Sequence, residues 1–182
     1  ENCAREVLER FTLGIDNRYT EDDIREVARA FTGWQYKQSR RRGARAIEFV
    51  KNLDSHDPGE KTILGQTGKF DGDDVLDILC KHPGTARYIA QKAWEYFAYE
   101  DVEAKTLDRV TRTFFDSGLQ AKSLIRAIMT DEQFYSERAM GTRFKSPVDF
   151  CIGTARSIGV QQLERADASR PVPFGSLLKV AT

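Results

Sequence analysis

The amino-acid sequence predicts a mainly α-helical fold: an orthogonal array or bundle of six to seven helices, with one small β-hairpin inserted between the second and third helices. Apolar residues recur every three to four positions through most of the chain, as they do on the buried face of a helix. These stretches begin or end at capping residues, glycine or proline, which are the usual helix boundaries. One interval, at about residues 35–68, alternates apolar and polar residues instead, and this pattern favours strands.

The first two helices are expected before residue 34. Gly14 is the expected stop of the first helix. Thr20 is the expected N-cap of the second, where Asp23 completes a capping-box arrangement, and Gly33 is expected to end it. The buried faces are predicted to be Cys3, Val7, Leu8 and Phe11 in the first helix, and Ile24, Val27, Ala28 and Phe31 in the second.

The later helices have equally clear boundaries. Asp71 is the expected cap of a short third helix, and Pro83 is expected to begin the fourth, because proline is tolerated in a first helical turn. The fourth helix has the longest apolar stripe, so we expect it to be the central core helix around Trp94. A last helix is expected to begin at Ser146 and Pro147. The stripes of the fourth to sixth helices are Ala86, Ile89, Ala90, Ala93, Trp94 and Phe97; Leu107, Val110 and Phe114; and Leu124, Ile125, Ile128 and Met129.

The predicted hairpin lies between the second and third helices. Residues 47–49 alternate between apolar and polar side chains, and residues 62–64 are expected to pair with them. The polar residues 54–60 would then form the tip of a long hairpin.

Length and composition indicate one folded domain. The chain has 182 residues, of which 40% are hydrophobic and 31% charged, a balance typical of globular proteins. We expect a helical domain over residues 1–160, with the hairpin insertion at about 35–68. Residues 161–182 are expected to form a loop and the start of a truncated final helix.

The charge balance gives no general attraction to nucleic acid, because 28 basic and 28 acidic residues leave a formal net charge of zero. One basic cluster, Lys37 with Arg40–Arg42 and Arg45, lies near aromatic residues and offers a nucleic-acid interpretation. We interpret it instead as a solvated loop or a contact with an N-terminal part that this chain lacks, so no nucleic acid is expected as a partner. No apolar run approaches the ~20 residues that a membrane span requires, so no span is expected.

Three cysteines, Cys3, Cys80 and Cys151, are widely spaced among apolar residues. We interpret them as buried small hydrophobic residues and not as a disulfide or a metal site. No cofactor is predicted, because no cofactor-binding signature stands out in the sequence.

The strongest candidate for a functional site is the polar segment at residues 54–61. His56, Asp57 and Lys61 are candidate catalytic residues, and Asp54, His56 and Asp57 are candidate metal ligands, because imidazole and carboxylate groups serve both chemistries. Their spacing matches no defined ligand pattern. The alternative is a polar turn, in which Asp57-Pro58-Gly59 supplies the turn residues and His56 bonds to the backbone.

An ordered set of short strings along the chain resembles a known bacterial family, domain of unknown function 1800. The strings include Asn2-Cys3-Ala4-Arg5-Glu6, Phe11-Thr12-Leu13-Gly14, Phe31-Thr32-Gly33-Trp34, His56-Asp57-Pro58-Gly59-Glu60-Lys61, Leu64-Gly65-Gln66-Thr67-Gly68 and Lys145-Ser146-Pro147-Val148-Asp149-Phe150. The resemblance is strong over about residues 1–160, and the chain is similar to an internal and C-terminal portion of longer members. It implies a bacterial source, a full-length protein that is exported to the periplasm or outside the cell, and a neighbouring gene for a sulfatase-like exported protein. It implies no reaction, cofactor or catalytic residue.

Two alternative functions are therefore considered for the chain. The first is a non-catalytic helical binding or assembly domain of an exported bacterial protein, with the sulfatase-like protein as a candidate partner. The alternative is a hydrolase-type or metal-dependent enzyme, whose site at residues 54–61 would be completed by segments that this chain lacks.

Overall fold

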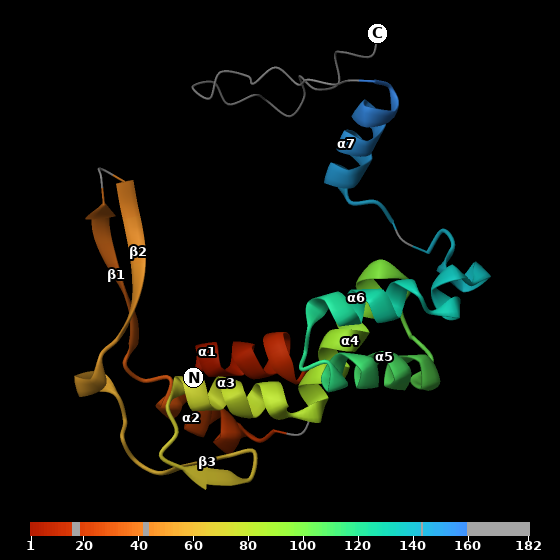
Figure 1. Cartoon of the computed structure of the whole chain (residues 1–182). Coiled ribbons are helices and arrows are strands. Elements are labelled where there is room, and N and C mark those ends of the chain that lie inside the picture. Colours follow the sequence, from red (N-terminus) through yellow and green to blue (C-terminus); the bar gives the residue numbers. More distant parts are fainter. Residues whose placement is uncertain (16–18, 42–43, 143, 160–182) are drawn as a thin grey trace. The chain divides into compact units, whose positions relative to one another are not determined.

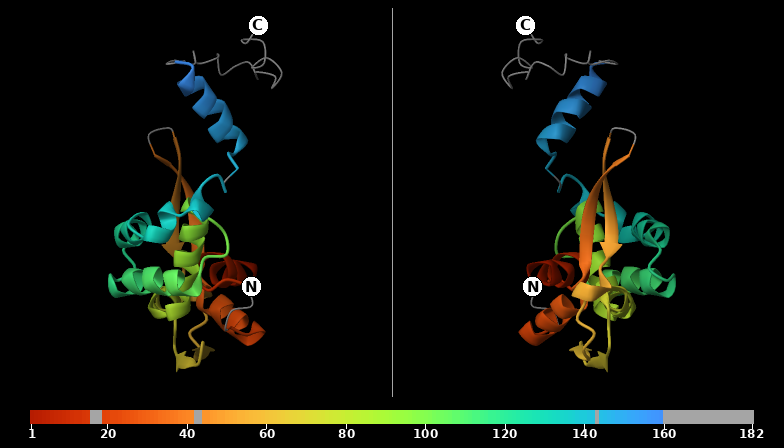
Figure 2. Two further views of the ribbon diagram at one scale, coloured as in Figure 1. Left: turned by 90° about the vertical axis from the view of Figure 1, so that its right-hand side faces the viewer. Right: turned by 90° about the vertical axis from the view of Figure 1, so that its left-hand side faces the viewer.

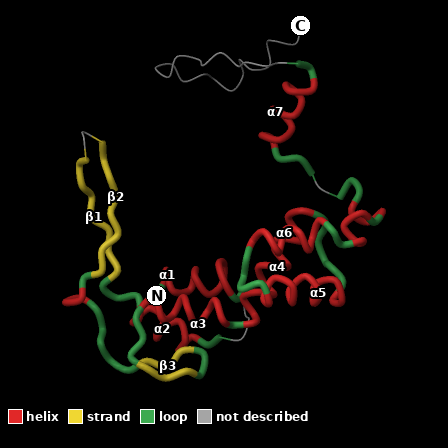
Figure 3. Tube along the Cα trace, viewed as in Figure 1, coloured by secondary structure: helices red, strands yellow, loops and turns green. Residues whose placement is uncertain are grey.

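A computed structural model describes residues 1–15, 19–41, 44–142 and 144–159 of the chain. The fold is mainly helical, as predicted (Figures 1 and 3). Its described helices are α1 (Asn2–Glu6), α2 (Glu21–Ala30), α3 (Gly72–Lys81), α4 (Pro83–Phe97), α5 (Ala104–Asp116), α6 (Ala121–Met129) and α7 (Pro147–Ser157). Its described strands are β1 (Trp34–Arg41), β2 (Ala44–Lys51), β3 (Lys61–Ile63) and β4 (Gln66–Gly68). Among these helices, none is long and apolar enough to cross a lipid bilayer.

The chain divides into two compact units, Glu1–Thr142 and Arg143–Thr182. The first unit contains α1–α6 and the four strands, and the second contains α7. The boundary predicted at residue 160 therefore falls inside the second unit. The loop and final helix predicted for residues 161–182 lie outside the described residues.

The first hydrophobic cluster joins α1, α2, α3 and β3. A π-helical stretch, Val7–Thr12, continues α1, and α2 begins at the predicted capping box. In that box, Asp23 N donates to Thr20 Oγ1 at 3.1 Å and Thr20 N donates to Asp23 Oδ2 at 2.8 Å. The second oxygen of Asp23 accepts from Leu64 N at 2.7 Å, so the same carboxylate also holds the strand region against α2. The buried members of the cluster are Ala4, Leu8, Leu13, Ile24, Val27, Ala30, Ile63, Val75 and Leu79.

The second hydrophobic cluster is built around α4, as predicted. Trp94 is fully buried, and its ring meets the Tyr99 ring edge-on at a centroid distance of 5.5 Å. α5 and α6 pack against α4 and supply the opposite side of the cluster. Its buried members are Ala86, Ala90, Trp94, Ala98, Tyr99, Leu107, Val110, Phe114, Leu124 and Ile128.

The strand region differs from its prediction, because it contains two hairpins. β1 pairs with β2, so Tyr36 lies opposite Phe49, and β3 pairs with β4, so Lys61 lies opposite Gly68. The predicted pairing of residues 47–49 with residues 62–64 is wrong. Each segment pairs instead with its nearest neighbour in sequence, which closes a shorter loop and costs less chain entropy. The β1–β2 hairpin extends away from the α1–α3 helices (Figures 1 and 2).

The prediction that the cysteines are buried is also wrong, since Cys3, Cys80 and Cys151 are all exposed. In α1 and α3 the buried positions are taken by the neighbouring residues Ala4 and Leu79, which leaves each cysteine beside the apolar stripe. In α7 no residue is buried. This helix nevertheless begins as predicted, because Ser146 Oγ accepts from Asp149 N at 3.1 Å.

We predict that Trp94→Ala lowers the free energy of unfolding by about 3–5 kcal/mol, because it leaves a large cavity in the second cluster. Urea unfolding followed by far-ultraviolet circular dichroism measures the loss. Phe11→Ala is the control, since Phe11 is 64% exposed and its removal should cost about 0.5 kcal/mol or less. Similar losses in the two variants would contradict the central position of Trp94.

Candidate functional site

The predicted site residues lie in the segment that joins the two hairpins. A 3₁₀ turn, Leu53–Ser55, opens this segment, and Asn52 Oδ1 caps it by accepting from Asp54 N at 3.2 Å. Asp54 itself is exposed. The segment then crosses to the C-terminal end of α2, where its polar groups meet Thr32 and Arg29.

Asp57 forms an ion pair with Arg29 of α2. Arg29 Nε donates to Asp57 Oδ2 at 2.8 Å, and Asp57 Oδ1 accepts from Gly59 N, also at 2.8 Å. Arg29 also pairs with Glu26 at 2.8 Å. The Arg29 guanidinium, followed by the Gly59 N–H, lowers the pKa of Asp57 to about 2, because both bonds favour the ionised carboxylate.

Lys61 is buried, with 1% of its surface exposed. Its Nζ donates to Asp57 O at 2.7 Å and to Gly59 O at 2.9 Å, so one amino group bridges two carbonyls of the turn. A buried charge is tolerated when hydrogen bonds and an opposite charge compensate its lost hydration. The backbone carbonyls and the nearby Asp57 carboxylate supply both.

His56 bonds to the backbone at the end of α2. Its Nδ1 lies 3.0 Å from Thr32 O and donates to it, because a carbonyl oxygen only accepts. The Thr32 hydroxyl accepts from Asp57 N at 2.8 Å, so a second hydrogen bond joins the segment to Thr32.

The structure therefore brings His56, Asp57 and Lys61 into one corner, but their bonds join the segment to α2 and to its own backbone. In the described part of the chain, no group of three or more His, Cys, Asp or Glu side chains is placed to hold a metal ion. The geometry favours the polar-turn interpretation, and the catalytic and metal assignments stay predictions. Arg29 was not among the predicted residues, because its partner lies 28 positions away and leaves no local pattern.

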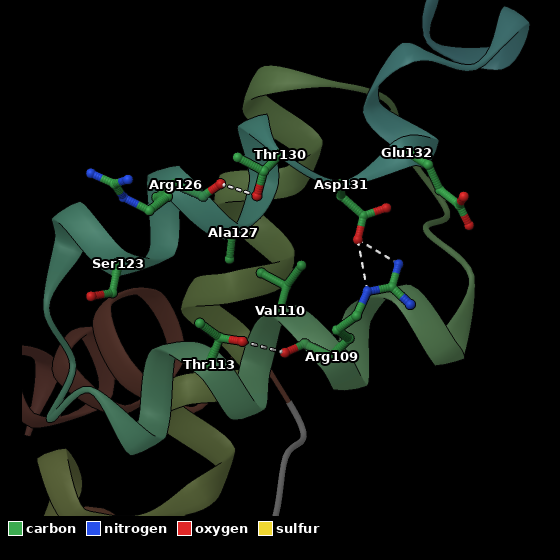
Figure 4. A pocket seen from close by; sticks show the side chains of 9 residues that line it. All are labelled: Arg109, Val110, Thr113, Ser123, Arg126, Ala127, Thr130, Asp131 and Glu132. Carbon is green, nitrogen blue, oxygen red and sulfur yellow. Dashed lines mark hydrogen bonds and ion pairs between the residues drawn. The ribbon is translucent and has the colours of Figure 1, made fainter.

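A groove of about 610 Å³ between α5 and α6 is a second candidate (Figure 4). Arg109 Nε donates to Asp131 Oδ2 at 2.9 Å, and the side chain of Asp131 is only 3% exposed. The hydroxyls of Thr113 and Thr130 donate to carbonyls of their own helices. The lining contains two arginines and two acidic residues, so its formal charges balance. We therefore give the groove no further role. The lining residues are Arg109, Val110, Thr113, Ser123, Arg126, Ala127, Thr130, Asp131 and Glu132.

The third candidate is the hairpin of β1 and β2, which we call the arm. Residues directly opposite each other in an antiparallel pair share one face of the sheet. Tyr36 pairs with Phe49 and Gln38 with Ile47, and the Phe49 ring meets the Trp34 ring edge-on at 5.2 Å. Tyr36, Ile47 and Phe49 are 70%, 74% and 57% exposed. We call the side formed by Trp34, Tyr36, Ile47 and Phe49 the aromatic face.

The base of the arm is fixed to the start of α3. A Cβ atom on Gly72 would lie 2.3 Å from the Trp34 ring, so this close approach requires glycine. Lys51 Nζ binds Asp71 at 3.3 Å and also binds Asp73, and these two carboxylates raise the pKa of Lys51, with Asp73 the larger cause. The arm is thus anchored at its base, and its Tyr36, Ile47 and Phe49 side chains are exposed.

The basic cluster lies largely in strands, which corrects the interpretation of this stretch as a loop. Arg40 and Arg41 belong to β1 and Arg45 to β2, whereas Arg42 lies outside the described residues. The two strands together contain five basic residues and one acidic residue, for a net charge of +4 in a chain whose net charge is zero.

A family model described as "Protein of unknown function (DUF1800)" matches residues 1–176. The chain belongs to this family. The match confirms the resemblance seen in the ordered strings. No match to the DUF1800 chain was found among curated proteins or among solved structures.

In this DUF1800 chain, we predict that Asp57 contributes to stability in a pH-dependent way. The pKa of Asp57 is about 2 in the folded chain, against an ordinary value of 3.8. Its stabilisation of the fold is therefore complete above pH 3.8 and is lost as the pH falls toward 2. Denaturant unfolding across this window should therefore show a steeper decline for the wild type than for Asp57→Asn, which keeps an oxygen to accept from Gly59 N. Asp54→Asn, which removes an exposed carboxylate from the same segment, should decline like the wild type.

We also predict that Lys61→Met lowers the free energy of unfolding by about 1–3 kcal/mol, because the carbonyls of Asp57 and Gly59 lose their common donor. Lys69→Met is the control, since Lys69 is exposed. Equal stability of the two variants would show that Lys61 is not needed for the fold and would revive its catalytic interpretation.

Proposed function

We propose that this chain is a non-catalytic helical binding or assembly domain of an exported bacterial protein, and that the aromatic face of the arm is its contact surface. The observation that carries the proposal is the exposure of Tyr36, Ile47 and Phe49 together on one side of an anchored hairpin.

Exposed apolar residues scattered singly are normal, whereas residues gathered on one face indicate an interaction site. Aromatic side chains are enriched in protein interfaces, because they bury a large area for few rotatable bonds. A two-stranded sheet is also marginally stable in water, and covering its apolar face would stabilise it.

The helices provide the scaffold for this surface. We infer that α1–α6 form an orthogonal array or bundle, in which α4 contacts α3, α5 and α6. The fixed base of the arm, at Trp34 and Lys51, would transmit the rigidity of that scaffold to the contact surface.

The bonds of the polar segment support a binding domain over an enzyme. For a site at residues 54–61 to act in hydrolysis or metal binding, His56, Asp57 and Lys61 would have to give up bonds that hold the segment to α2. Such rearrangement costs the desolvation and hydrogen-bond energy of each group.

The proposal is tested by co-expressing the full-length protein with the sulfatase-like exported protein of the neighbouring gene, which we propose as its partner. We expect the two to purify together and the double variant Tyr36→Ser/Ile47→Ser to lose at least about 90% of the bound partner, because two exposed anchors are removed. The matched control is Tyr135→Ser/Ile15→Ser, since these residues are 69% and 73% exposed elsewhere in the same unit.

Equal recovery of partner with both double variants would exclude the aromatic face as the contact surface. A full-length protein that binds no partner, and that turns over a substrate in a reaction abolished by His56→Ala, would establish the enzyme alternative.

A further inference from the structure

The proposed function leaves open what kind of partner the arm receives. We propose that an extended protein segment, with alternating acidic and aliphatic side chains, adds to the outer edge of β1 as a third strand. This inference rests on the proposed function, since it specifies the partner of the same surface.

The edge of β1 has backbone groups directed outward. The arm is a two-stranded sheet, so each of its strands has one neighbour among the described residues. Asn52 N donates to Gly33 O at 2.8 Å, and these residues lie opposite each other at the base of the arm. Bonded and non-bonded pairs alternate along an antiparallel ladder, so the pairs of Tyr36 and Gln38 are non-bonded and their N–H and C=O groups point to the open edge.

The same residues contribute to the aromatic side of the sheet. Tyr36 presents its side chain on the aromatic face, and Gln38 lies opposite Ile47 on that side. A strand added at β1 would therefore place alternate side chains beside Tyr36, where aliphatic groups would cover exposed apolar surface. It would also bring the sheet to three strands, the number at which a sheet with an apolar face gains independent stability.

The charged residues of the two strands indicate that the added strand is acidic and that it pairs with β1. β1 contains Lys37, Arg40 and Arg41 and no acidic residue. β2 contains Arg45 and Glu48, whose charges cancel, and its Lys51 is already paired with the carboxylates at the start of α3. An acidic segment would gain most from β1, whereas the arm of a second copy has the same charge of +4 and would be repelled.

The experiment uses the full chain and a defined probe, a blocked peptide of alternating Glu and Val residues that is as long as β1. The control peptide has Lys in place of each Glu. We expect the Glu peptide to bind at least about tenfold more tightly than the Lys peptide, with a difference that shrinks in high salt.

Hydrogen exchange measured by NMR on the wild-type chain shows which strand edge the peptide binds. We expect the Glu peptide to protect the amides of Tyr36 and Gln38 and to leave those of Ile47 and Phe49, on the outer edge of β2, unchanged. Binding without protection at β1 would overturn strand addition.

A matched pair of variants tests the same point. Gln38→Pro removes an outward N–H at a position where an edge strand tolerates proline, and we expect it to weaken peptide binding by about tenfold or more. Gln38→Ala keeps the N–H and should bind like the wild type. Equal binding by the two variants would exclude the β1 edge.

Failure of this inference is distinct from failure of the proposed function. If the peptide does not bind, while recovery of the protein partner still depends on Tyr36 and Ile47, the arm binds its partner by another geometry. Tighter binding of anionic vesicles or mixed-sequence DNA, with no protection of the β1 amides, would overturn the assignment to a protein strand. If neither peptide nor partner depends on the arm, both proposals fail.

Discussion

Burial of Ala86, Ala90 and Trp94 on α4 is the constraint on which the rest of the first unit depends. Trp94 fills the second cluster between α5 and α6, while the first half of the same helix is tied to the first cluster. There, the Thr85 hydroxyl donates to Leu79 O at 2.7 Å, and the Tyr88 hydroxyl donates to Arg10 O at 3.3 Å. One helix thus joins two cores, and the strand region is built on the first of them.

Several ion pairs in this unit connect elements that are distant in sequence. Arg29 and Asp57 join α2 to the segment between the hairpins, and Arg109 and Asp131 join α5 to the turn after α6. The first of these pairs engages Asp57, one of the residues that the sequence predicts as catalytic. The aromatic face of the arm differs from these connections, because its Tyr36, Ile47 and Phe49 side chains are exposed and its two strands have a net charge of +4.

The sequence was sufficient to predict features that depend on neighbouring residues. The capping box at Thr20, the cap at Asp71, the proline that begins α4 and the core position of Trp94 all follow from local spacing. The partners of residues 47–49 and 62–64 were predicted wrongly, because alternation identifies a strand without identifying its neighbour. The ion pair between Arg29 and Asp57 and the outward edge of β1 depend on the folded arrangement, and no sequence pattern indicated them.

The carboxylate of Asp71 has two simultaneous tasks. Its Oδ1 accepts from the amides of Asp73 and Asp74 and so starts α3, while its Oδ2 pairs with Lys51 at the base of the arm. The base of the arm and the first turn of a core helix therefore share one carboxylate. Because Lys51 and the first amides of α3 bind the same side chain, movement of the arm at its base and fraying of α3 should be correlated.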